Sequence, residues 1–96
     1  MTGFILETFA TGATGDDLDT LSARAAGAVA AVDADGDPIR LLRSYFVPAD
    51  ELCLLVFEAG SLRAVEQAAT LAGLRIGRVV EALVHHGQTP DSEDDL

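Results

Sequence analysis

Several residue types that define large protein classes are scarce in this 96-residue chain. It has one cysteine, no tryptophan, 5% aromatic residues, and six basic against sixteen acidic residues, for a net charge of −10. A single cysteine, Cys53, cannot form an intramolecular disulfide, and its apolar setting favours a buried small hydrophobic residue. The negative charge is opposite in sign to the field that recruits nucleic acid or anionic lipid. We therefore expect neither nucleic-acid nor membrane partners.

Signals for export and for common enzyme classes are also missing. No window approaches eighteen uninterrupted apolar residues, and residues 1–10 have neither a basic region nor a small-residue cleavage pattern. The chain contains no P-loop, no Gly-x-Gly-x-x-Gly turn, no nucleophile elbow and no paired thiolate metal site. These absences exclude the corresponding enzymes and predict a cytoplasmic protein.

The residues that are present suit one folded domain, because 49% of them are hydrophobic. Short apolar runs bounded by turn residues predict strands at residues 3–9, 39–47, 51–59 and 78–85. Helical spacing of apolar positions predicts one helix from Asp16 or Asp17 to just before Asp35, and a second over residues 62–72, capped by Ser61 and ended by Gly73. We expect a domain over residues 1–86 and a disordered acidic tail over residues 87–96.

The predicted order of elements is β-α-β-β-α-β, which is the ferredoxin-like α+β arrangement. Right-handed crossovers then place the first and third strands in the middle of a four-stranded antiparallel sheet, with both helices on one face. The other face retains large side chains and needs a cover. A homodimer of the dimeric α/β-barrel type is the simplest solution.

The chain also resembles a small nickel-binding, ferredoxin-like family of actinobacterial proteins, many of whose members are recorded as a domain of unknown function. The resemblance spans residues 4–82 and is carried by Ile5-Leu6-Glu7-Thr8-Phe9, Arg43-Ser44-Tyr45-Phe46, the segment from Cys53 to Ala59, Ala64-Val65, Ala72-Gly73-Leu74 and Val79-Val80-Glu81. It implies the ferredoxin-like fold and nickel as a ligand. Most of these residues suit strand and helix packing.

A metal site is expected at one end of the sheet. Relatives in this family often have a histidine near the position of Arg43, and a guanidinium has no lone pair with which to replace it. His85 and His86 are the chain's two imidazoles, and the topology places them at the same end of the sheet as Glu58. These three residues are the predicted metal ligands. The alternative for Glu58 is a cross-strand ion pair with Arg40.

A ligand cavity is expected at the opposite end, around Glu7, Arg43, Tyr45 and Cys53. Glu7 lies in an apolar central strand, where an acid must either be paired or face a pocket. Tyr45 can orient a substrate oxygen, and Arg43 can hold an anionic group. The alternative is an internal ion pair between Glu7 and Arg43 beneath the dimer.

Three functions remain open at this point. The first is a homodimeric module that binds a small ligand or a metal ion, with nickel as the metal that the resemblance implies. The second is a cofactor-independent dimeric α/β-barrel enzyme, such as a monooxygenase, isomerase or cyclase, that acts on a small hydrophobic substrate. The third is a structural or regulatory dimer without a ligand. The low aromatic content is mild evidence against an aromatic-substrate pocket, and the binding module is favoured.

Overall fold

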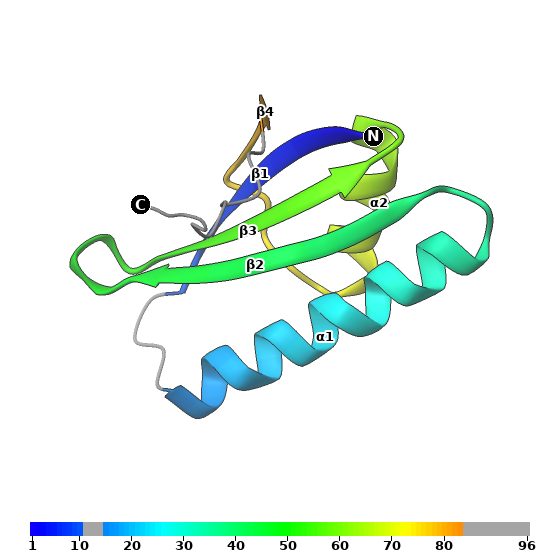
Figure 1. The fold of residues 1–96 in the computed structure, drawn as a ribbon. Helices are drawn as coiled ribbons and strands as arrows, with labels where there is room; N and C mark the ends of the chain where they lie inside the picture. The colour runs from blue at the N-terminus through cyan, green and yellow to red at the C-terminus, as the bar shows by residue number, and fades with distance from the viewer. Residues whose placement is uncertain (11–14, 84–96) are drawn as a thin grey trace, which may run out of the picture.

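A computed structural model describes residues 1–10 and 15–83 of the chain. The elements are β1 (Thr2–Phe9), α1 (Gly15–Ala34), β2 (Ile39–Val47), a short 3-10 turn (Pro48–Asp50), β3 (Leu52–Ala59), α2 (Leu62–Leu71) and β4 (Arg78–Ala82), as Figure 1 shows. Within the described ranges, no helix is long and apolar enough to cross a membrane.

The four strands form one sheet in the order β2-β3-β1-β4, and every neighbouring pair is antiparallel. The predicted fold class is confirmed, because this is the ferredoxin-like α+β arrangement with the first and third strands at its centre. Most predicted boundaries are within one residue, and the largest error is at β4, which ends at Ala82, short of the predicted end at residue 85. Residues 85 and 86, and the predicted acidic tail over residues 87–96, lie outside the described residues.

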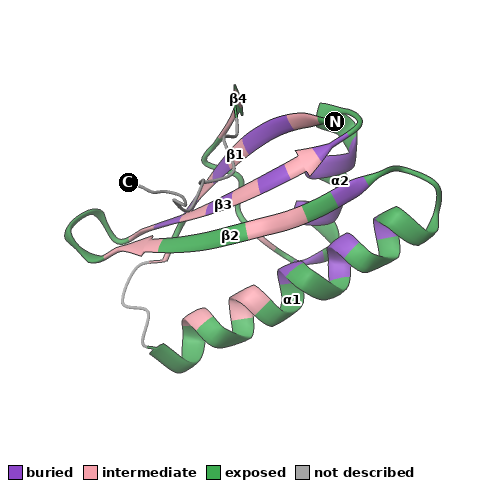
Figure 2. Cartoon of the chain, viewed as in Figure 1, coloured by how far each residue is buried: buried purple, intermediate pink, exposed green. Residues whose placement is uncertain are grey.

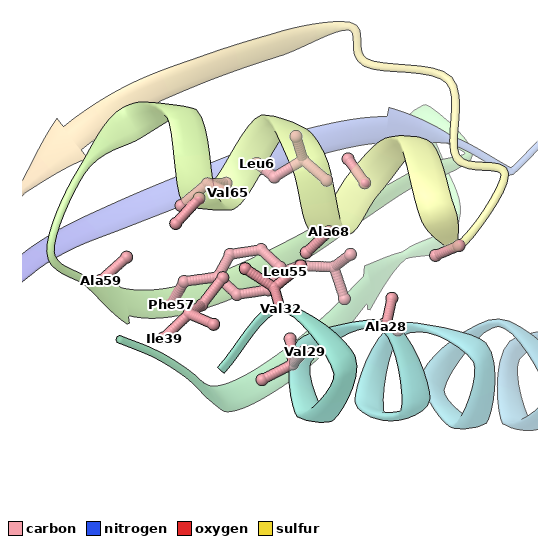
Figure 3. Close-up of a cluster of buried hydrophobic side chains, with 14 of the residues drawn as sticks. Leu6, Ala28, Val29, Val32, Ile39, Leu55, Phe57, Ala59, Val65 and Ala68 are labelled. Carbon is pink, nitrogen blue, oxygen red and sulfur yellow. The ribbon is translucent and has the colours of Figure 1, made fainter. Parts of the chain in front are cut away.

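The hydrophobic core lies between the sheet and the two helices (Figure 3). Along β3, buried and half-buried residues alternate without interruption (Figure 2), because successive strand side chains point to opposite faces. Leu6 and Leu55 are completely buried where β1 and β3 pair. Alanine and valine side chains of both helices cover this face, so one sheet surface holds the core.

The ends of α2 follow the chemistry expected from the sequence. The Ser61 hydroxyl accepts a hydrogen bond from the Ala64 backbone N–H at 3.2 Å, which satisfies an otherwise unpaired donor of the first turn. Gly73 has φ +71°, in the left-handed region that terminates helices. The Arg24 side chain from α1 donates to the Ala72 carbonyl oxygen at 2.9 Å. This bond ties α1 to the end of α2.

The hairpin between β2 and β3 has a short connection. Pro48 opens a 3-10 turn, and Glu51 closes it in the left-handed conformation with φ 48°. The Glu51 backbone N–H donates to the Pro48 carbonyl oxygen at 3.2 Å. β3 therefore begins at Leu52 and pairs with the end of β2.

Candidate functional site

The second face of the sheet, which we call the open face, is not covered by the helices in the described structure (Figure 1). Its central apolar side chains, such as Ile5 and Leu54, are only half-buried, whereas their strand neighbours Leu6 and Leu55 are buried. The strand registers assign the following residues to the open face: Gly3, Ile5, Glu7, Phe9, Arg40, Arg43, Tyr45, Val47, Leu52, Leu54, Val56, Glu58, Arg78, Val80 and Ala82.

A β-bulge determines which β2 side chains reach the open face. Leu41 pairs with the buried Phe57 and packs against the core, but the register shifts between Leu41 and Arg43. Beyond the shift, Arg43 pairs with Val56 of the open face. In a regular strand, Arg43 would share the face of Leu41, because side chains alternate with a period of two. The bulge therefore directs Arg43 away from the core.

Glu7 forms an ion pair with Arg78, the residue directly opposite it on β4. The Arg78 Nη2 to Glu7 Oε2 distance is 3.3 Å, with the two side chains 66% and 27% exposed respectively. The predicted ion pair between Glu7 and Arg43 was therefore wrong. β3 lies between the strands of Glu7 and Arg43, and the registers pair Glu7 with Leu54 and Arg43 with Val56.

Tyr45 completes a row of side chains that crosses the whole sheet. It pairs with Leu54, which pairs with Glu7, which in turn pairs with Arg78. Tyr45 is 50% exposed. Three of the four predicted cavity residues, Glu7, Arg43 and Tyr45, thus share the open face, although no hydrogen bond or ion pair joins them within the described residues.

Cys53, the fourth predicted cavity residue, lies on the other face of the sheet. It pairs with Thr8 on β1, and both residues are buried on the helix side. Burial raises the pKa of the Cys53 thiol through desolvation of the thiolate. The assignment of Cys53 to the cavity was therefore wrong, and its interpretation as a buried small hydrophobic residue holds.

At the far end of the sheet, Glu58 forms the expected cross-strand ion pair with Arg40. Glu58 also lines an open hollow of about 510 Å³ at the β1 and β4 ends, together with Met1, Thr2, Gly3, Glu81, Ala82 and Leu83. The described residues contain no group of three or more His, Cys, Asp or Glu side chains suited to a metal ion. His85 and His86, the predicted imidazole ligands, lie outside these residues.

Sequence reasoning missed Arg78 as a residue of this surface. The signal was available in the topology, since an antiparallel β4 begins beside the end of β1 and so brings its first residue opposite Glu7. The bulge at Leu41 and Arg43 has no comparable signal, because neither glycine nor proline interrupts β2.

The fold and the open face together define a ferredoxin-like α+β domain with one uncovered sheet surface. The crystal structure of SCO4226 from Streptomyces coelicolor A3(2) is similar to this chain, with a TM-score of 0.69 and 21% sequence identity over 88% of this chain and 99% of that chain. This likeness shows a shared fold. No protein-family model matches the chain, and no curated protein matches it.

Proposed function

We propose that the protein is a homodimeric binding module, in which two open faces oppose each other and enclose a small ligand. The observation that carries the proposal is the uncovered and largely apolar surface of a sheet whose other surface holds the core. Six of its residues, Ile5, Val47, Leu52, Leu54, Val56 and Val80, have aliphatic side chains that are only half-buried.

The size of the open face supports a second copy of the chain as its cover. β1 and β3 have eight residues each in a four-stranded sheet, so the face measures roughly 19 by 26 Å, or about 500 Å². The face is therefore as large as the largest exposed patches of typical monomers, roughly 300–600 Å², which are often functional. Two opposed copies would bury on the order of 1,000 Å² in total, at the lower end of specific interfaces, and a two-fold axis makes one face complementary to itself.

The distribution of charge supports the same partner. The open face has three arginines, Arg40, Arg43 and Arg78, and two glutamates, Glu7 and Glu58, so its formal charge is 3 − 2 = +1. The whole chain has a charge of −10. Two copies therefore repel each other least when they approach through this face.

A matched pair of substitutions tests the dimer. Leu54→Lys places a charge at the centre of the open face beside Glu7, whereas Leu71→Lys makes the same change on α2, where Leu71 is already 61% exposed. Light scattering should give a dimer mass for the wild type and Leu71→Lys, and a monomer mass for Leu54→Lys. A monomeric wild type at micromolar concentration, or a dimeric Leu54→Lys variant, would contradict the proposed interface.

Metal binding is a second candidate function, supported by the hollow at the β1 and β4 ends. Two carboxylates, those of Glu58 and Glu81, line it, and its last residue, Leu83, precedes His85 by two positions. Imidazole and carboxylate ligands suit nickel or zinc. Because Glu58 is held by Arg40 and three-donor groups are absent among the described residues, binding would depend on His85 and His86.

Calorimetric titration of untagged protein with Ni²⁺ or Zn²⁺ tests this second candidate. We expect the wild type to bind and the His85→Ala/His86→Ala variant to lose affinity, with Glu58→Gln reducing it less. Equal affinity in the double variant would rule out this site, and no binding by the wild type would remove the metal function.

A further inference from the structure

The open face carries one charged side chain whose charge no other described residue neutralises. Glu7 pairs with Arg78, and Glu58 pairs with Arg40. Arg43 is exposed, and within residues 1–10 and 15–83 it has neither an ion-pair partner nor a side-chain hydrogen bond. The formal charge of +1 on this face therefore resides at Arg43.

The bulge gives this arginine its position. Without the register shift after Leu41, the Arg43 side chain would share the face of Leu41, on the helix side of the sheet. Bulges redirect side chains, and they are frequent beside binding sites. Tyr45, two residues later, lies on the same face and adds a phenol hydroxyl to it.

An apolar row extends from Arg43 across the sheet. Arg43 pairs with Val56, Val56 with Ile5, and Ile5 with Val80 on the opposite edge strand. The row crosses all four strands, a span of roughly 14 Å at the usual strand spacing, which is about the length of an extended chain of ten to twelve carbons. The row therefore has the Arg43 guanidinium at one end, followed across the sheet by the aliphatic side chains of Val56, Ile5 and Val80.

We propose that the ligand is an amphipathic organic anion, with its carboxylate or similar group bound by Arg43 and its apolar body along Val56, Ile5 and Val80. This inference rests on the proposed function, since the second sheet excludes water from the row. The guanidinium suits a carboxylate because its donors form two parallel hydrogen bonds to the two oxygens. A cationic ligand is disfavoured, because Arg78 occupies the carboxylate of Glu7.

Two probes of equal chain length, decanoate and 1-decanol, separate the anion contact from the apolar contact. The protein has no tryptophan and one tyrosine, so its intrinsic fluorescence reports directly on Tyr45 beside the proposed anchor. Affinities come from calorimetry, and light scattering on the same samples gives the oligomeric state. We compare the wild type with Arg43→Gln and with Arg63→Gln, which removes the same charge from an exposed position on α2.

We expect the wild type and Arg63→Gln to bind decanoate about tenfold or more tightly than 1-decanol. A hydrogen bond between two charged groups typically contributes an affinity difference of this size. In Arg43→Gln this preference should disappear while 1-decanol still binds. Equal affinities of the wild type for both probes would contradict anion binding by Arg43, and so would a preference for decanoate that persists in Arg43→Gln. Neither result would contradict the binding of an apolar chain to this face. Dissociation of the Arg43→Gln dimer would assign Arg43 to the interface instead. Failure of both probes to bind a dimeric wild type would overturn the proposed binding function as well.

Discussion

Replacing Gly77 with alanine should destabilise the protein, because the backbone of β1 occupies the space that a side chain would need. The Gly77 N–H donates to the Glu7 carbonyl oxygen at 2.8 Å, and a Cβ atom on Gly77 would lie 2.9 Å from that oxygen and 3.4 Å from the Phe9 ring. Glu7 belongs to a central strand paired on both sides, so its carbonyl cannot move without disturbing two ladders.

The size of the effect follows from two opposing contributions. Overpacking of this kind costs about 1–3 kcal/mol, and the lower freedom of alanine in the unfolded chain returns about 0.4–1 kcal/mol. The expected net loss is about 1–2 kcal/mol in the free energy of unfolding. For a domain of this size, the loss corresponds to a Tm lower by roughly 5–15 °C.

Gly60→Ala is the matched control. The Gly60 N–H also donates to a backbone carbonyl, that of Pro38, at 2.9 Å, but a Cβ atom on Gly60 would meet its nearest neighbour, Pro38 Cδ, at 3.5 Å, an ordinary contact. Neither Gly60 nor Gly77 has a positive φ. Thermal and urea unfolding should therefore show Gly60→Ala at or slightly above the stability of the wild type. Equal stability of the two variants would refute the steric argument.

Two further predictions concern single side chains. Ser61→Ala should lower the free energy of unfolding by about 1 kcal/mol, because it removes the acceptor for the Ala64 N–H, and Ser61→Asp should retain stability in the same urea titration. For Cys53, the raised pKa of the folded thiol means that its contribution to stability is complete below the ordinary thiol range of about 8.5 and is lost as pH rises above it. The Tm of the wild type should thus fall more steeply between pH 8 and 10 than that of Cys53→Ala; parallel curves would show that the thiol ionises as readily in the folded protein as in the unfolded chain.

The fold was predictable because local signals agreed with one another. Ser61 and Gly73 mark the two ends of α2 through side-chain and backbone chemistry that depends on few neighbours. The two-residue period of β3 also places Cys53 on the same face as Leu55 and Phe57, and that face is buried in the structure. The sequence therefore indicated that these three residues lie together, and the predicted cavity did not take this into account.

The candidate site was less predictable, because it depends on registers between strands. Counting by two from the buried Ile39 places Arg43 under the helices, and only the shift after Leu41 directs it to the open face. The partner of Glu7 depends on where β4 begins, and Arg78 was therefore missed. The two-residue period of a strand indicates which of its own residues share a face. It does not indicate which residue of the neighbouring strand lies opposite each of them.

The composition of the core connects the stability of the fold with the proposed dimer. Of the sixteen buried hydrophobic residues that the structure describes, seven are alanine. An alanine buries little apolar area, so a core of this kind provides less stabilisation than one of leucine and isoleucine. The larger aliphatic side chains Ile5, Leu54 and Val56 instead lie half-buried on the open face. Under the proposed dimer, a substantial part of the hydrophobic stabilisation arises on association, and the Tm should therefore rise with protein concentration.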